Sequence, residues 1–376
     1  MFKFFINVKF WAPFVVVALF FLIMELLLRN GIWDKNIKPL SYLGHGVYRA
    51  KAIKAYGLDK PNWISVGNSI IDWGLDHKTL RTALKEKDID YIRMSMGSSK
   101  FPAIQMVSDW SIENMDNLQG IIIGSSATSL GKYNMLTQYK IAWPFISSYD
   151  NQNYDYDVTN SPIEHLYQKL AFSVYFDDIK DYFINYKKHL KNYNRYTKPN
   201  KILNFNKKMN RNLCGYELAN LTECIETANY LRKANKTIKN RLAEKEIKRR
   251  CPAKISKKKM AANRLSSPIS DELIELYIQN WTKLFTSIAE KGLSVKFFVL
   301  PEHPLLKYTT KPIGMDQVMN QLLANISTLK NVEIYDLREL YEQHPSYEIC
   351  ELFNDGIHLS QTGKQIFTQE VLTSFE

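Results

Sequence analysis

Three side chains that lie far apart in the sequence have the types that activated-serine chemistry requires. Ser69 follows the short apolar run Trp63–Gly67. Asp355 and His358 stand three residues apart near the C-terminus. A serine hydroxyl is a poor nucleophile near neutral pH unless an imidazole takes its proton, and a carboxylate usually orients that imidazole. We therefore predict a triad in which Asp355 accepts from the Nδ1–H of His358 while its Nε2 faces the Ser69 hydroxyl.

Acyl chemistry at a serine also needs hydrogen-bond donors for the oxyanion that forms on the attacked carbonyl. The backbone N–H groups of Ser69 and Gly97 are the candidates, although Gly97 could instead be a turn glycine that needs a positive φ. His303, between Pro301-Glu302 and Pro304, could line a substrate site or belong to a rigid turn. Asp72 could contact a substrate, but an acidic residue is also favoured near a helix start. The remaining histidines carry no partner signal and are expected at the surface: His45, His77, His165, His189 and His344.

Short apolar strands must position these residues. Five runs are predicted to be strands: Trp63–Gly67, Asp90–Met96, Gly120–Gly124, Ser294–Leu300 and Val332–Asp336. Five helical patterns accompany them: a helix capped by Asp76, Pro102–Met115, Asp271–Lys291, Met315–Leu329 and a last helix that begins near Ser360. Strands that alternate with helices indicate a parallel sheet covered on both faces. The predicted fold is therefore α/β, a three-layer α/β/α sandwich with a five-stranded, flavodoxin-like parallel sheet, in which ligands gather outside the carboxyl ends of the strands.

The spacing of these elements divides the chain into five segments. Residues 1–30 are predicted to be a membrane anchor, 31–59 a connector, 60–131 the first part of the core, 132–268 an insertion and 269–376 the second part of the core. The insertion is aromatic and polar at first and rich in Lys and Arg afterwards. A structureless loop of that length inside a compact domain would be unusual, so we expect the insertion to have its own, mostly helical structure.

The N-terminal segment indicates in which cellular compartment the rest of the chain lies. Phe10–Leu28 is a run of 19 residues in which Glu25 is the single ionisable group. A membrane-spanning helix needs about 20 mostly apolar residues, and no small-residue cleavage site follows the run. We predict an uncleaved signal anchor that contacts the lipid bilayer through residues 10–28. The lysines at 3 and 9 favour a cytoplasmic N-terminus and an extracytoplasmic remainder, although positive charges also follow the run; the alternative is a buried core helix.

The positive charge is concentrated in one segment. The whole chain has 50 Lys and Arg against 38 Asp and Glu. Between Lys180 and Arg264 the counts are 24 and 6, which leaves 26 and 32 for the rest of the chain. This distribution predicts either a patch that meets an anionic partner, such as lipid headgroups or a charged glycan, or a solvated helical insertion. Nucleic acid is not an expected partner of an exported domain.

No cofactor or metal motif accompanies the serine. The four cysteines form no metal-ligand cluster, and the chain contains neither a Walker-type phosphate loop nor a dinucleotide fingerprint. In an oxidising compartment Cys214 and Cys224 could form a disulfide, whereas four unrelated thiols are the alternative. We therefore expect no cofactor.

The chemistry-bearing segments resemble the SGNH (GDSL-like) hydrolase superfamily. The resemblance lies in a strand that ends in Gly-Asn-Ser, a glycine after the second strand, and a C-terminal Asp-x-x-His-Leu-x-x-x-Gly from Asp355 to Gly363. It covers about residues 60–130 and 270–375. Together with the anchor, the chain is similar to exported acyl-transfer members, such as cell-wall polysaccharide O-acetyltransferases and the D-alanyl-lipoteichoic acid transfer proteins. The resemblance implies Ser69 as nucleophile, His358 as base and Asp355 as its orienting partner, with oxyanion donors from the Ser69 and Gly97 backbones.

Two positions depart from the pattern of this superfamily. The first block has Gly-Asn-Ser where Gly-Asp-Ser is common. The third block usually supplies an asparagine side chain to the oxyanion, and Ser126 stands at the corresponding position. A hydroxyl can donate one hydrogen bond but reaches less far than an amide. Either Ser126 replaces the asparagine, or Asn68 helps, or the oxyanion site is weaker; Ser126 could also be an ordinary helix cap.

From these features we expect a membrane-anchored serine O-acyltransferase or acyl esterase that acts on an extracytoplasmic glycan or cell-envelope polymer. Its partners would be an acyl donor, the glycan or polymer acceptor and a membrane-bound acyl-transfer protein. The alternative is a catalytically inactive SGNH-like adaptor that binds an anionic polymer or lipid through the basic insertion.

Overall fold

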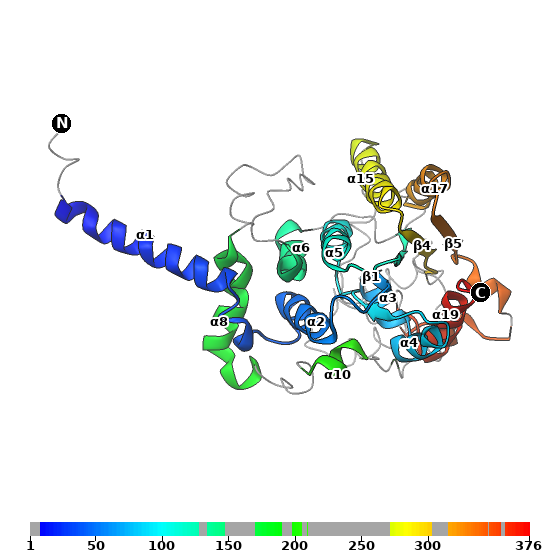
Figure 1. The fold of residues 1–376 in the computed structure, drawn as a ribbon, viewed down its shortest axis with the longest axis horizontal. Coiled ribbons are helices and arrows are strands. Elements are labelled where there is room, and N and C mark those ends of the chain that lie inside the picture. The colour runs from blue at the N-terminus through cyan, green and yellow to red at the C-terminus, as the bar shows by residue number, and fades with distance from the viewer. Residues whose placement is uncertain are drawn as a thin grey trace, which may run out of the picture. The chain divides into compact units, whose positions relative to one another are not determined.

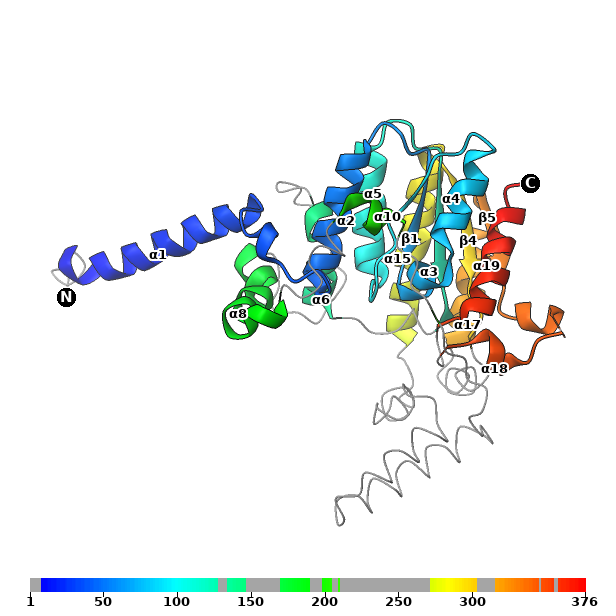
Figure 2. The same cartoon turned by 90° about the horizontal axis from the view of Figure 1, so that it is seen from below.

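The computed structural model describes residues 8–127, 134–146, 170–189, 198–204, 209, 271–302, 315–344, 346–354 and 358–376. The chain divides into two compact units, shown together in Figures 1 and 2. The first unit comprises residues 1–55 and 133–202, and the second comprises residues 56–132 and 203–376.

The second unit is built on a five-stranded sheet. The strands are β1 (Trp63–Gly67), β2 (Tyr91–Arg93), β3 (Gly120–Ser125), β4 (Ser294–Val299) and β5 (Val332–Asp336). Every neighbouring pair is parallel, and the order is β2-β1-β3-β4-β5. The predictions of an α/β fold and a five-stranded parallel sheet are confirmed. β1 and β3 are buried along their whole length, which explains their continuous apolar sequences.

Helices lie on both faces of this sheet. Figure 1 shows α5 (Phe101–Asn114), α15 (Asp271–Glu290) and α17 (Met315–Ile326) on one side of it. On the other side lie α3 (Ser69–Gly74), α4 (His77–Lys85) and α19 (Gln361–Thr373). The short helices η6 (Leu340–Gln343) and α18 (Ile349–Leu352) precede α19. Two of these helices begin where the sequence predicts. Asp76 Oδ1 accepts from Thr79 N at 3.1 Å at the start of α4, and Ser360 Oγ accepts from Gly363 N at 3.2 Å at the start of α19.

The strand order reverses at β1. The chain leaves β1 for β2 on one side, and β3 then pairs with β1 on the other side. In an open parallel sheet the carboxyl ends of the strands diverge at such a reversal, and ligands bind there. Gly67, the last residue of β1, pairs with Gly124 of β3 at this point. Residues that follow β1 are therefore placed at the edge where chemistry is expected.

Gly363 holds α19 close to the preceding chain. A Cβ at Gly363 would lie 2.2 Å from the carbonyl oxygen of Leu352, which is backbone and cannot rotate away. We predict that Gly363→Ala lowers the free energy of unfolding by about 1–3 kcal/mol, measured by urea denaturation of the full chain in detergent. Gly74→Ala is the matched control, because its Cβ would make only ordinary contact, 3.7 Å from Leu359 Cδ1. Equal effects of the two substitutions would contradict the packing argument.

The first unit contains the apolar N-terminal helix. Its elements are α1 (Val8–Arg29), η2 (Asp34–Asn36), α2 (Tyr42–Tyr56), α6 (Met135–Ala142), η4 (Trp143–Phe145), α8 (Ala171–His189) and α10 (Pro199–Leu203), the last residues of α2 and α10 crossing into the second unit. At 1.5 Å per residue α1 is about 33 Å long, enough for a hydrocarbon core of about 30 Å. Trp11–Arg29 has the length and hydropathy of a membrane span. The segment that was expected only as a connector contains α2.

A small core joins the end of α1 to the rest of this unit. Leu28 of α1, Val47 of α2 and Val174 of α8 are buried in the same cluster. The carboxylate of Glu25 forms an ion pair with Arg29 at 2.8 Å. The last turn of α1 is therefore part of the folded unit, while its earlier turns, from Trp11 to Ile23, are exposed.

Much of the predicted insertion lies outside the described residues, including most of its Lys- and Arg-rich part. Cys350 is disulfide-bonded. The alternative of four unpaired thiols is therefore wrong at this residue. Cys214, Cys224 and Cys251, and with them the predicted 214–224 pairing, lie outside the described residues.

Candidate active site

Ser69 is presented by a tight strand-to-helix turn. It follows β1 directly and is the first residue of α3. Asn68 is the N-cap, with its Oδ1 accepting from Ile70 N at 2.8 Å. Gly67 has a φ of +154°, and a Cβ there would lie 3.0 Å from the carbonyl oxygen of Gly124. The turn leaves Ser69 half-buried at the carboxyl edge of the sheet.

His358 reaches Ser69 from the other end of the chain. The Nε2 of its imidazole lies 2.9 Å from Ser69 Oγ, across 289 positions of sequence. The residue is 3% exposed. A short antiparallel bridge between Phe353 and Leu359 holds its position, and Asn354 N donates to the His358 carbonyl at 2.8 Å. The structure thus brings together the predicted nucleophile and base, whereas Asp355 lies outside the described residues.

Trp73 contacts the imidazole and was missed in the sequence. Its ring centroid lies 4.5 Å from that of His358, with the planes inclined at 33°. Residues four apart on a helix share a face. The spacing of Trp73 from Ser69 on α3 was therefore the signal that could have identified it. The indole restricts the directions in which the His358 ring can turn.

The backbone N–H groups of Ser69 and Gly97 are the candidate oxyanion donors. Ser69 is the first residue of α3, so its N–H has no intrahelical acceptor. Gly97 lies in the turn after β2, next to Met96, whose N–H donates to the Gly67 carbonyl at 3.0 Å. The turn that contains Gly97 therefore runs beside the end of β1, where Ser69 begins the helix.

The other predicted site residues differ in their surroundings. Ser126 follows β3 and is fully buried. Asn68 uses its side-chain oxygen to cap α3, so this oxygen serves the helix. His303 lies outside the described residues. The described residues therefore bring Ser69, His358, Asn68 and Gly97 to the same edge.

Asp72 is a structural residue, and a direct contact with substrate is excluded. Its carboxylate is 1% exposed and accepts from Arg93 Nε at 2.6 Å, with Arg93 Nη2 donating to the same oxygen. Ser95 Oγ donates to this oxygen at 3.3 Å. This buried ion pair joins α3 to the end of β2. It therefore fixes the helix that carries Ser69 against the strand that leads to Gly97.

The surface positions predicted for His77 and His189 are wrong. His77 is 1% exposed, and its Nδ1 lies 2.7 Å from the Tyr91 hydroxyl, which in turn lies 2.6 Å from Ser65 Oγ. His189 is fully buried in the first unit. A buried imidazole needs partners for both nitrogens: His77 Nε2 lies 3.2 Å from the Asp72 carbonyl, and the nitrogens of His189 contact Asp181 and the Asn36 carbonyl.

The site has the groups needed to activate an alcohol nucleophile. Its centre is a hydroxyl in hydrogen-bond contact with a buried imidazole. Within the described ranges, no group of three or more His, Cys, Asp or Glu could hold a metal ion. The chain matches no protein-family model and no curated protein.

Proposed function

We propose that the protein is a membrane-anchored serine O-acyltransferase or acyl esterase of the SGNH type, acting on an extracytoplasmic glycan or cell-envelope polymer. One observation carries the proposal, the 2.9 Å contact between Ser69 Oγ and His358 Nε2. Its place at the carboxyl edge of a parallel sheet, beside the reversal in strand order, supports a ligand site there.

The first half of the reaction forms an ester on Ser69. His358 Nε2 takes the hydroxyl proton as Ser69 Oγ attacks the acyl carbonyl. The carbonyl oxygen becomes an oxyanion that the N–H groups of Ser69 and Gly97 stabilise, and each such donor is worth about 3–4 kcal/mol. The bond to the leaving group breaks, and the leaving group takes the proton from His358. Asp355 is assigned to orient the imidazole.

The second half releases the acyl group. An acceptor hydroxyl gives its proton to His358 and attacks the acyl carbonyl of the Ser69 ester. When the tetrahedral intermediate collapses, the acceptor keeps the acyl group and Ser69 Oγ recovers the proton from His358. A sugar hydroxyl as acceptor gives transfer, and water gives hydrolysis.

Two observations support an extracytoplasmic location. Helix α1 has the length and hydropathy of a membrane span, and the two lysines before it favour a cytoplasmic N-terminus. Cys350 is disulfide-bonded, and structural disulfides persist mainly in oxidising compartments. An acyltransferase in that position would meet polymers of the cell envelope.

Labelling with a fluorophosphonate tests the nucleophile. Ser69 Oγ would bond to phosphorus, fluoride would leave, and the hydroxyl proton would pass to His358. We expect the full chain in detergent to be labelled on the peptide that contains Ser69. Ser69→Ala should abolish labelling, whereas Ser327→Ala, which removes an exposed hydroxyl from the same unit, should not. A folded wild-type protein without label at Ser69 would contradict the proposal.

Trp73 gives a further prediction about positioning. Trp73→Ala removes the surface against which the His358 ring rests, so we expect kcat for p-nitrophenyl acetate to fall by roughly 10- to 100-fold, with a smaller change in KM. Trp73→Phe keeps an aromatic face and should recover most of the activity. Loss of activity that Phe does not restore, or a change confined to KM, would show that Trp73 does not position the imidazole.

A further inference from the structure

Helix α8 carries large apolar side chains on its surface. Phe176 is 43% exposed, Phe183 72%, Ile184 66% and Tyr186 54%. The opposite face, which includes Val174 and Tyr175, is buried in the core of the first unit. Large apolar exposure concentrated on one helix is typical of a surface that meets another apolar phase.

The N-terminal end of α8 is attached to α1. Glu25 accepts from the backbone N–H of Ala171 at 2.8 Å and of Phe172 at 3.0 Å. A carboxylate in this position satisfies unpaired donors and stabilises the helix dipole. The single ionisable residue of the apolar run therefore has a structural role, which is to fix α8 at the end of the predicted membrane span.

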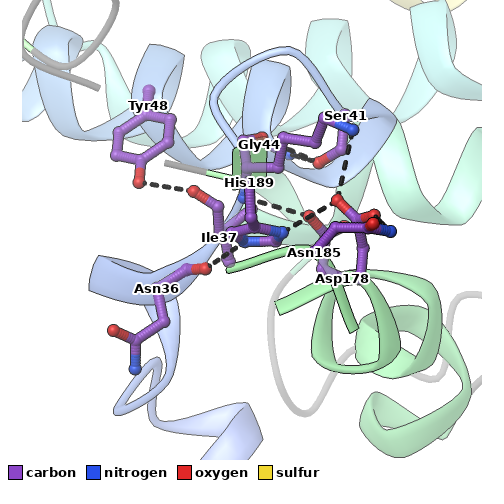
Figure 3. Close-up of polar contacts among 10 residues, drawn as sticks. Asn36, Ile37, Ser41, Gly44, Tyr48, Asp178, Asn185 and His189 are labelled. Atoms are coloured by element: carbon purple, nitrogen blue, oxygen red, sulfur yellow. Dashed lines mark hydrogen bonds and ion pairs between the residues drawn. The ribbon is translucent and has the colours of Figure 1, made fainter. Parts of the chain in front are cut away.

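The C-terminal part of α8 is held by polar contacts with the segment that follows α1. His189 Nε2 lies 2.6 Å from the Asn36 carbonyl, and Figure 3 shows the two residues facing each other. Asp178 Oδ1 accepts from the backbone N–H of Lys38 at 3.0 Å. His189 Nδ1 lies 3.0 Å from Asp181. Hydrogen bonds lower the pKa of Asp181 to about 2; the largest effect comes from Asn185, and smaller ones come from His189 and Lys38. Because both ends are attached, α8 has a defined orientation relative to α1.

The aromatic rings of α8, of which Phe172 is half-buried and Phe176 and Phe183 are exposed, continue those of α1. The Phe21 and Phe172 rings are 5.7 Å apart, and Phe172 and Phe176 are 5.9 Å apart. Phe183 lies 6.1 Å from Trp33. Positions 172, 176 and 183 recur at the i, i+4, i+11 spacing of one helix face. An aromatic stripe thus extends from the exposed surface of α1 along α8.

Helix α8 also lies crosswise to α1. It is seen from the side in Figure 1 and close to its own axis in Figure 2, while α1 extends sideways in both views. If α1 crosses a bilayer, α8 runs along the surface of that bilayer. Lys180 is exposed on the same helix, and Lys187 and Lys188 are exposed beyond the kink at Asn185. Lysines beside an aromatic face are typical of helices that bind anionic lipid surfaces.

We infer that α8 is an interfacial helix, which inserts the stripe Phe172, Phe176 and Phe183 into the boundary between lipid headgroups and acyl chains, next to the end of α1. The inference rests on the membrane anchor within the proposed function and is independent of the chemistry at Ser69. Aromatic rings are favoured at this depth of a bilayer because their faces are apolar and their surroundings partly polar.

Photo-cross-linking in liposomes tests this position. The full chain is prepared with p-benzoylphenylalanine in place of Phe183, and in a second protein in place of Phe176, and is reconstituted with radiolabelled phosphatidylcholine and phosphatidylglycerol. Val17, exposed on α1, is the control for the anchor, and Lys54, exposed on α2, is the control for a position without lipid contact. We expect roughly tenfold more lipid on positions 176, 183 and 17 than on position 54.

The outcomes separate the inference from its premise. Lipid on position 17 but not on positions 176 and 183 would overturn the interfacial helix and leave the anchor intact. Lipid on none of the three would overturn the anchor as well. Cross-links from position 183 to a protein in native membranes, with no lipid adduct, would also overturn the inference, because they would assign the stripe to a protein partner. Fluorophosphonate labelling of the same samples reports separately on Ser69.

Discussion

Ser69→Ala is expected to lower kcat for p-nitrophenyl acetate by on the order of 10⁴- to 10⁶-fold, because it removes the atom that forms the acyl-enzyme. His358→Ala should cause a loss of similar size, since it removes the imidazole that lies 2.9 Å from the Ser69 hydroxyl. Residues that act as one unit are strongly non-additive. The double substitution should therefore be scarcely worse than either single one.

Ser327→Ala is the matched control for these rates, because it removes an exposed hydroxyl of the same unit whose Oγ donates to the Ala324 carbonyl. It should keep the wild-type kcat. Wild-type rates in the Ser69 variant, or losses that multiply in the double variant, would show that the two side chains do not form a catalytic unit. Rates that are normal throughout would favour an adaptor built on the same fold.

Asp72→Ala is expected to lower the free energy of unfolding by about 3–5 kcal/mol, because it leaves the Arg93 guanidinium buried without its counter-charge. The measurement is urea denaturation of the full chain in detergent, followed by near-ultraviolet circular dichroism. The same substitution should also slow fluorophosphonate labelling, since the ion pair holds α3 against the end of β2.

Asp336→Ala provides the comparison for the stability prediction. It breaks an ion pair with Arg338 in which the side chains are 38% and 22% exposed, so the loss should be no more than about 1 kcal/mol. If the two substitutions destabilise the protein equally, the buried pair does not have the structural role assigned to it.

Most of the sheet could be predicted from the sequence because β1 to β4 are almost entirely buried, whereas β5 is partly exposed. β1 and β5 begin and end at the predicted residues, and β3 is one residue longer. β2 is shorter than predicted, yet Met94 N and Met96 N still donate to the carbonyls of Ser65 and Gly67. Apolar runs of four to seven residues determine strand positions well when no face is exposed to water.

Helix α2 was not predicted because its glycines suggest a loop. A Cβ at Gly44 would lie 2.0 Å from the Lys38 carbonyl oxygen, and one at Gly46 would lie 2.1 Å from that of Ile141. These glycines allow backbones to approach closely, which the local sequence does not indicate. The burial of His77 and His189 was not predicted for a related reason. It depends on contacts with other elements, such as that of His77 with Tyr91 and that of His189 with Asn36.

The candidate site was predictable in part. Ser69 and His358 were paired from residue types and from the expected meeting of strand ends, and the structure brings them into contact. Trp73 and the Asp72–Arg93 pair were missed, because an aromatic or acidic residue on a short helix has many ordinary explanations. The contact between Ser69 and His358 was thus easier to anticipate than the packing around it.

The most direct test is to trap the covalent intermediate. The full chain is mixed with p-nitrophenyl acetate, quenched in acid within the first turnover and digested, and the peptide that contains Ser69 is examined by mass spectrometry. We predict one acetyl ester on Ser69 in the wild-type protein and none in Ser69→Ala or His358→Ala. A folded wild-type protein that hydrolyses the ester without ever carrying acetyl on Ser69 would contradict the assignment of Ser69 as the nucleophile.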